Sequence, residues 1–350
     1  MKYNRLGRTG LYVSRICFGT MTFSGENFLG GVIGNSDQKE ATHLINKCLE
    51  AGVNFFDTAD VYSAGNSEIM TGHAFRDLGL QRSEFVLATK VYGRMGKGVN
   101  DIGASRGHIM DGISRSLERL KLDYVDLYQI HATDLITPVE ETMQALNDLV
   151  RQGMVRYVGV SNWTAWRIAK ANGIAERHGW ARIDSLQAYY SIAGRELERE
   201  LVPLVEEDRI ACLPWSPLAG GYLSGKFSPG VGGKAEGRRK SFDFPPLDKD
   251  KADNIVAVMR PIAKAHNSSV ARVALAYVLA KPWVTSVIIG ARNEKQLDDN
   301  LEAVDLKLTA EEMTKLDETS ALTSEYPHWM LERFGAERVV PRENGRSDSE

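Results

Sequence analysis

The amino-acid sequence predicts a (β/α)8 barrel, in which eight parallel strands are each followed by a helix. Short runs of apolar and β-branched residues alternate strictly with stretches of helical periodicity, and eight such pairs follow one another along the 350 residues. This alternation implies parallel strands joined by crossover helices, and eight is the number that closes a barrel. An open doubly wound sheet would normally carry GxGxxG after its first strand, whereas this chain has GTMTF at 19–23. We therefore expect one barrel domain over 1–350.

The expected elements follow in order. A β-hairpin is expected at 1–15, where KYNRLGRTGLYVSR turns near Gly7–Gly10 and can plug the bottom of the barrel. The apolar runs that predict the strands are 16–21, 54–59, 85–91, 125–131, 155–162, 185–191, 210–216 and 284–290. The helical periodicities are 37–51, 67–78, 105–120, 138–151, 164–178, 196–207, 270–281 and 294–303. Four of these helices stop at a glycine suited to the left-handed conformation: Gly52, Gly79, Gly153 and Gly179.

Capping signals and long connections complete this outline. Asp37…Glu40 and Thr309…Glu312 have the spacing of capping boxes, and the second opens a C-terminal helix and tail at 306–350. Two connections, 22–36 and 217–249, are too long for ordinary strand-to-helix loops. Long loops in a compact domain are usually functional, so we expect these two to act as lids or clasps over a ligand.

The composition excludes several classes of partner. The formal net charge is −3 with charges interspersed, so the chain offers no bulk attraction to nucleic acid or to an anionic membrane. Cys17, Cys48 and Cys212 lie in apolar runs without metal-ligand spacing, which argues against zinc and disulfides and indicates a reducing compartment. The N-terminus has no apolar signal segment and no run reaches transmembrane length, so we expect a cytoplasmic location.

Polar residues gather at the carboxyl ends of the expected strands, the end at which barrel enzymes perform their chemistry. In chain order these residues are Asp57, Tyr62, Lys90, His131, Ser161, Asn162, Gln187, Tyr190, Trp215, Ser216 and Arg292. Each alone has an ordinary explanation, such as loop capping for Asp57 or a hydrogen-bonded core histidine for His131. Their joint placement at one mouth favours an active site.

The chemistry of this set follows from pairing. A lysine beside a carboxylate stays charged when partly buried, so we expect Lys90 to pair with Asp57. An ammonium near Tyr62 favours the phenolate and lowers the pKa of the phenol, because a unit charge at ~4 Å with an effective dielectric of ~20 contributes about 4 kcal/mol. Such a tyrosine can give a proton to a carbonyl oxygen, and His131 can hydrogen-bond the same oxygen. A carbonyl that accepts a proton in this way also requires a hydride source.

The sequence resembles the aldo-keto reductase superfamily over nearly its whole length. The matching segments are GTMTF (19–23), GVNFFDTADVYSAGNSE (52–68), VLATKVYG (86–93), LDYVDLYQIH (122–131), VRYVGVSN (155–162), LQAYYS (186–191), PWSPLAGGYLSGKF (214–227) and VIIGARNEKQLDDNLE (287–302). The chain is similar in particular to the bacterial branch that resembles potassium-channel β subunits. The resemblance implies an NADP(H)-dependent oxidoreductase with a small-molecule carbonyl or alcohol substrate, and it leaves a homo-oligomer open.

Residue roles carry over from the resemblance position by position. The family's catalytic tetrad falls on Asp57, Tyr62, Lys90 and His131. The cofactor-binding positions fall on Gly19, Thr20, Met21, Asp57, Ser161, Asn162, Gln187, Trp215, Ser216, Leu218, Gly220, Lys226, Arg239, Gly290, Arg292, Gln296, Asp299 and Asn300. Within this set the resemblance implies carboxamide binding by Ser161, Asn162 and Gln187, and nicotinamide stacking by Trp215, where many members have tyrosine. Arg239 completes a pyrophosphate clasp, with Arg238 as the alternative because the loop length departs from that of related members.

The last motif bears on the choice between NADPH and NADH. Many family members carry a lysine where this chain has Gly290, but Arg292 can still supply a guanidinium to the 2′-phosphate. A solvated arginine is the ordinary explanation of Arg292, although a helix N-terminus does not favour a cation. We therefore expect NADPH.

Three functions stay open on the sequence alone. The first is an NADPH-dependent reductase of aldehydes or ketones, and the second is a cofactor-binding regulatory subunit like the channel β subunits. His131 favours the first, because those subunits have asparagine there. The third is a dehydrogenase acting mainly on an alcohol or sugar, with Tyr62 as the base. The substrate depends on 22–36, 92–104 and the tail, where Tyr326, His328, Trp329 and Phe334 form either an aromatic wall or outer packing.

Overall fold

The computed structural model describes residues 1–24, 36–228, 239 and 242–335. It divides into two compact units, 1–320 and 321–350, so the prediction of one domain over 1–350 stays a prediction. The second unit contains helix α11 (His328–Gly335), which the sequence interpretation missed. This helix has only 8 residues, and its large apolar side chains are exposed, so its sequence shows no clear helical periodicity.

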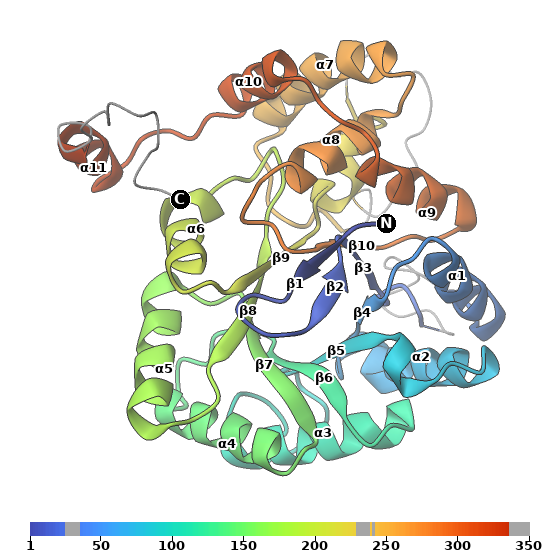
Figure 1. Ribbon diagram of the computed structural model, residues 1–350, viewed down its shortest axis with the longest axis vertical. Helices are drawn as coiled ribbons and strands as arrows, with labels where there is room; N and C mark the ends of the chain where they lie inside the picture. The colour runs from blue at the N-terminus through green and yellow to red at the C-terminus, as the bar shows by residue number, and fades with distance from the viewer. Residues whose placement is uncertain (25–35, 229–238, 240–241, 336–350) are drawn as a thin grey trace. The chain divides into compact units, whose positions relative to one another are not determined.

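The first unit is the predicted (β/α)8 barrel, with eight parallel strands inside a ring of helices (Figure 1). The strand order is β10-β3-β4-β5-β6-β7-β8-β9. The strands are β3 (Ile16–Gly19), β4 (Phe55–Asp57), β5 (Val86–Val91), β6 (Val125–Ile130), β7 (Val155–Ser161), β8 (Ile183–Tyr189), β9 (Ala211–Trp215) and β10 (Val287–Ile289). The gap between β9 and β10 is closed by a single bridge, Cys212 with Val284, beside a hydrogen bond from the Thr285 amide to the Cys212 carbonyl at 2.9 Å.

The helices follow the predicted alternation with one addition. They are α1 (Gln38–Glu50), α2 (Asn66–Asp77), α3 (Arg106–Leu120), α4 (Val139–Arg151), α5 (Ala165–His178), α6 (Leu197–Glu207), α7 (Lys249–Ala265), α8 (Val270–Leu279), α9 (Glu294–Leu301) and α10 (Ala310–Thr319). The sequence interpretation omitted α7, which carries a proline, Pro261, in its interior. The predicted capping box of α10 is confirmed, since Thr309 and Glu312 bond each other's main chain.

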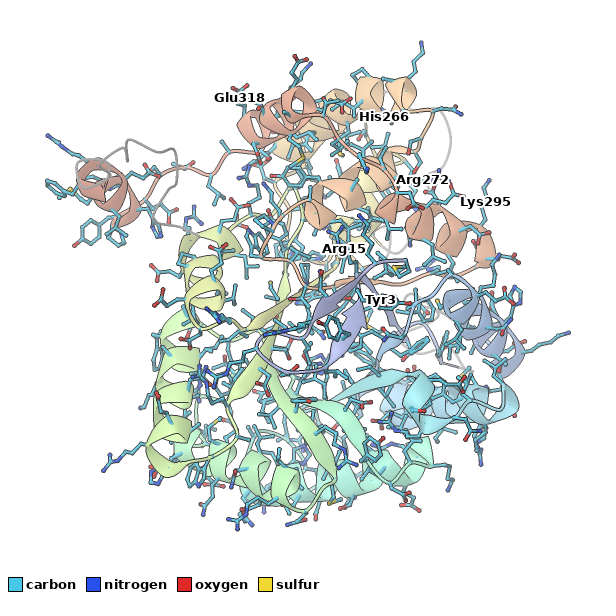
Figure 2. The ribbon with its side chains drawn as sticks, in the orientation of Figure 1. Tyr3, Arg15, His266, Arg272, Lys295 and Glu318 are labelled. Carbon is cyan, nitrogen blue, oxygen red and sulfur yellow. The ribbon has the colours of Figure 1, made fainter. Side chains whose placement is uncertain are left out.

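The N-terminal hairpin consists of β1 (Tyr3–Arg5) and β2 (Tyr12–Ser14), and it closes the amino end of the barrel. Leu6 and Val13 are fully buried in one cluster with the inward-facing residues of the strands. The Asn4 side chain donates to the Thr285 carbonyl just before β10, at 2.9 Å. Arg15, labelled in Figure 2, donates to the Leu279 carbonyl at the end of α8. The predicted site residues lie toward the opposite end, where the strands terminate.

Candidate active site

The Lys90 side chain, near the end of β5, contacts the last residue of β4 and two residues that follow β4. Its ammonium donates to Asp57 Oδ2 at 2.5 Å, to the Thr58 carbonyl at 2.7 Å and to Tyr62 Oη at 3.2 Å. Lys90 is 0% exposed and Asp57 is 2% exposed. An ammonium has three protons to donate, and here each has an acceptor.

These neighbours keep Lys90 charged. Burial alone lowers its pKa, but the charges of Asp57 and Tyr62 and hydrogen bonds to both raise the pKa of Lys90 above its ordinary value. The interaction is reciprocal, so the Lys90 ammonium favours a phenolate at Tyr62. The structure thus brings together the three residues that the sequence analysis combined for proton transfer.

Asp57 is held by two amides as well as by the ammonium. Its Oδ1 accepts from Gln187 Nε2 at 2.9 Å and from Gln129 Nε2 at 3.3 Å. The sequence analysis expected Gln187 to bind a carboxamide, and here its amide nitrogen goes to Asp57. Gln129 was missed, although its signal was present: it lies two residues after the inward-facing Leu127 of β6, so a polar side chain enters the barrel there.

A tight turn carries Tyr62 over this pair. Within the 3₁₀ segment Tyr62–Gly65, Ser63 and Ala64 adopt left-handed φ values of 50° and 53°, and Gly65 has φ 94°. A Cβ on Gly65 would lie 2.7 Å from Arg119 Cδ, so only glycine fits. This strained turn places the Tyr62 ring edge-on to the ring of His131, with their centroids 5.6 Å apart.

His131 directly follows β6 and is partly buried. Burial, and then the charge of Lys90, lower the pKa of His131 to about 3. The imidazole is therefore neutral at physiological pH, and it can donate one hydrogen bond to a substrate oxygen without carrying a charge.

His131 also makes stability depend on pH. Its folded pKa lies below the unfolded value, so the unfolded chain binds more protons between about pH 3 and 6.5. The free energy of unfolding therefore falls as the pH falls through this window, by up to about 1.4 kcal/mol per pH unit. We expect His131→Gln to remove this part of the slope in urea unfolding at pH 7.5, 6 and 5. His178→Gln, at an exposed position, is the control, and equal slopes in wild type and His131→Gln would contradict the expectation.

Asn162, expected at the nicotinamide, lies in the left-handed conformation with φ 57° and links two strand ends. Its Nδ2 donates to the His131 carbonyl at 3.1 Å and to Ser161 Oγ at 3.0 Å, and its Oδ1 accepts from Trp215 Nε1 at 3.1 Å. The Trp215 ring stacks on Phe244 with centroids 5.8 Å apart and planes inclined by 11°. Phe244 was missed, because it lies in the long 217–249 connection, where spacing gives no direction to a side chain.

The expected pyrophosphate clasp begins with a turn after β9. Ser216 Oγ accepts from the Gly220 amide at 2.9 Å, and the intervening Leu218 is partly buried. Gly220 has φ 66°, and a Cβ there would lie 2.6 Å from the Phe244 carbonyl oxygen. Arg239 is 7% exposed, and its guanidinium donates to the Ala219 carbonyl at 2.7 Å and also to Asp243 and Pro245. Arg239 thus holds the connection together, and its contact with a pyrophosphate stays a prediction.

The residues expected at the adenosine end lie before and along α9, with Gln296 in its first turn and Asp299 and Asn300 in its last. The Arg292 amide donates to Gln296 Oε1 at 3.0 Å, and Asn300 Nδ2 donates to the Gly290 carbonyl at 3.3 Å. Asp299 accepts from Ser269 Oγ at 2.8 Å and from Arg272 Nε at 2.7 Å. Its carboxylate is thus held by α8 residues, of which Arg272 is labelled in Figure 2.

Lys226 and Arg292 form a positive pair between the clasp and the adenosine end. Burial, and then the charge of Arg292, lower the pKa of Lys226. A bound anion would offset the repulsion between these two cations, so their charges fit a phosphorylated nucleotide.

The remaining predicted site residues lie at the end of β3. Gly19 pairs in register with Asp57, and the Thr20 amide donates to the Asp57 carbonyl at 2.9 Å. Met21 is partly buried. Residues 25–35 of the first long connection lie outside the described residues, as do 229–238 and 240–241 of the second, including Arg238.

The barrel mouth thus combines a buried carboxylate–lysine pair with a tyrosine and a neutral histidine, groups that can together move a proton. The chain belongs to the aldo/keto reductase family, whose profile matches residues 15–321. Among the described residues, no helix is long and apolar enough to cross a membrane.

Curated relatives cover almost the whole chain. A protein named probable voltage-gated potassium channel subunit beta, from Oryza sativa subsp. japonica, is 38% identical over 91% of this chain and 96% of its own. The uncharacterized oxidoreductase YrpG of Bacillus subtilis is 36% identical over 91% and 95%. The versiconal hemiacetal acetate reductase of Aspergillus parasiticus is 34% identical over 91% and 96%.

Proposed function

We propose that the protein reduces an aldehyde or ketone to the alcohol, reversibly, with NADPH as its cofactor, in the cytoplasm. The observation that carries the proposal is the Lys90 ammonium, which is bonded to Asp57 on one side and to Tyr62 Oη, 3.2 Å away, on the other. Bound NADPH supplies the hydride that reaches the carbonyl carbon. Tyr62 supplies the proton to the carbonyl oxygen, and Lys90 stabilises the phenolate that is left.

His131 orients the substrate in this proposal. Its imidazole is neutral, because burial and Lys90 lower its pKa to about 3, so it can hydrogen-bond the carbonyl oxygen without competing with Tyr62 as the acid. Trp215, fixed by Asn162 through its indole nitrogen at 3.1 Å, offers a flat face to the nicotinamide ring. The amide oxygen of Gln187 and the side chains of Ser161 and Asn162 would meet the carboxamide.

The direct test follows NADPH absorbance with the full-length protein and a panel of aromatic, aliphatic and sugar aldehydes together with a quinone. Turnover of any carbonyl compound supports the proposal, and the preferred compounds begin to define the substrate. If the protein binds NADPH but oxidises none of it with any compound, the reductase proposal is wrong.

A second candidate is a cofactor-binding subunit without significant turnover. The similarity to the rice protein named as a channel β subunit favours it. His131 argues for the enzyme, as do the contacts that keep the Lys90 pair in place at the barrel mouth. Tight NADPH binding without turnover in the panel assay would move this candidate ahead.

The proposed preference for NADPH depends on Arg292. We expect Arg292→Ala to weaken NADPH binding about 10–100-fold, because a charge-assisted hydrogen bond contributes about 1.5–3 kcal/mol, and to leave NADH binding nearly unchanged. Fluorescence titration with both cofactors measures the two affinities. Lys295→Ala is the matched control, since Lys295 is an exposed cation in the first turn of α9 (Figure 2). Equal losses for NADPH and NADH in Arg292→Ala would contradict the expectation.

A further inference from the structure

A second buried carboxylate, Asp60, lies two residues before Tyr62 and has no place in the chemistry described so far. Asp60 is 1% exposed, and within the described part of the chain neither of its carboxylate oxygens accepts a hydrogen bond of ordinary geometry, although the adjacent Val61 amide acts on the carboxylate. The Asp60 amide donates to the Lys90 carbonyl at 3.2 Å, and Tyr62 follows two residues later. A buried carboxylate without ordinary hydrogen bonds is costly, so its presence requires a reason.

Titratable groups from four elements face Asp60, and three of them carry a charge. Glu68 of α2 is 0% exposed and accepts from Thr89 Oγ1 at 2.5 Å and from Arg119 Nε of α3 at 2.6 Å. Lys90 of β5 acts on Asp60 through its charge, and Tyr128 of β6 is buried and has its pKa raised by burial, then by the charges of Asp60 and Glu68. Asp60 and Glu68 therefore both interact with Arg119, but only Glu68 forms the salt bridge with it.

Because Arg119 pairs with Glu68, Asp60 is left with too little positive charge nearby to keep its pKa low. Burial, and then the charge of Glu68, raise the pKa of Asp60 to about 7, although the Val61 amide, Arg119 and Lys90 act in the opposite direction. Asp60 thus changes charge near neutral pH.

Asp134 shows what a structural aspartate looks like in this chain. Its carboxylate accepts from the Ala104 amide at 2.7 Å, the Ile136 amide at 2.8 Å and Thr137 Oγ1 at 2.8 Å. These bonds outweigh burial and lower the pKa of Asp134 to about 2. Asp60 has no comparable set of bonds, since the adjacent Val61 amide alone acts on its carboxylate from the main chain and without ordinary hydrogen-bond geometry, so loop capping does not explain it.

We propose that Asp60 is a positioning residue for proton transfer, whose buried carboxylate acts through the Lys90–Tyr62 pair above it. This inference rests on the proposed function. When Asp60 is ionised, its negative charge stabilises the Lys90 ammonium. The same charge disfavours the negatively charged phenolate of Tyr62. The Tyr62 phenol then keeps its proton to higher pH, which extends the range over which it can act as an acid.

The test measures Tyr62 itself. The full-length protein is labelled with tyrosine carrying ¹³C at Cζ, the Tyr62 signal is assigned by its loss in Tyr62→Phe, and its titration is recorded in wild type and in Asp60→Asn. Asparagine keeps the shape of the side chain and removes its charge. We expect Asp60→Asn to lower the midpoint of the Tyr62 titration by about half a pH unit or more. It should also remove a second inflection near neutral pH.

The control is Asp126→Asn, a buried carboxylate paired with Arg82 at 2.6 Å near the amino end of β6, away from the barrel mouth. It should leave the Tyr62 titration unchanged. The inference is overturned if Asp60→Asn and wild type titrate together, or if Asp126→Asn shifts Tyr62 as much as Asp60→Asn does. The titration needs no substrate. A shifted Tyr62 in a protein that reduces no carbonyl compound would therefore support the role of Asp60 and reject the reductase.

Discussion

Replacing Tyr62 with phenylalanine should lower kcat for carbonyl reduction by a factor of about 100–10,000, the usual contribution of a positioned acid. The substitution keeps the ring that packs against His131 and removes only the proton that Lys90 helps to release. We expect NADPH affinity to be unchanged, because the variant alters no residue of the proposed cofactor clasp. Steady-state rates with a substrate found in the panel, together with a fluorescence titration of NADPH, separate the two effects.

Tyr12→Phe serves as the control, since Tyr12 is exposed on β2 at the far end of the barrel. It should leave both kcat and NADPH affinity at wild-type values. A Tyr62→Phe variant that keeps more than a tenth of the wild-type kcat would show that the proton comes from another group.

The second large effect concerns stability. Asp57→Asn should lower the free energy of unfolding by about 3–5 kcal/mol, because it leaves the buried Lys90 ammonium without its carboxylate. Urea unfolding at neutral pH measures the loss. Asp208→Asn is a suitable control: Asp208 pairs with Arg182 at 3.4 Å near the surface, where an ion pair contributes about 1 kcal/mol or less.

The double variant Asp57→Asn/Lys90→Met separates stability from chemistry. Methionine fills the space of the lysine stem without a charge, so no unpaired ammonium remains and most of the lost stability should return. Activity should not return with the stability, because Tyr62 has lost the ammonium that favours its phenolate. The expectation is contradicted if the loss of unfolding free energy in the double variant equals the sum of the losses in Asp57→Asn and Lys90→Met. The Asp57–Lys90 pair would then not be the source of the instability.

The barrel could be predicted from the sequence because its pattern is local and repeated. Buried parallel strands appear as short apolar runs, and the helices between them bury one stripe each. Helix α7 was missed because Pro261 interrupts a helical pattern in a region interpreted as following a long loop. Helix α11 was missed because it has only 8 residues, too few to establish a period, and because none of them is buried.

The site was predictable where position on a strand determines direction. Asp57, Lys90 and His131 lie at the carboxyl ends of neighbouring strands, and parallel pairing brings such ends together. What the sequence could not give are contacts that depend on side-chain conformation. The bond from Gln187 to Asp57, the stacking of Phe244 on Trp215 and the isolation of Asp60 all belong to this kind.

The single bridge between β9 and β10 has a consequence for the protein's resistance to proteases. Every other neighbouring pair of barrel strands is joined by at least three paired residues, although the β7–β8 ladder shifts register at Val158/Gly159, so local opening should begin at this seam. Trp215 ends β9 and Lys226 follows it, whereas Gly290 and Arg292 follow β10. A nucleotide that contacts both sides, as proposed, would fasten the seam from outside, and cleavage of the segments beside it should then slow as the cofactor concentration rises.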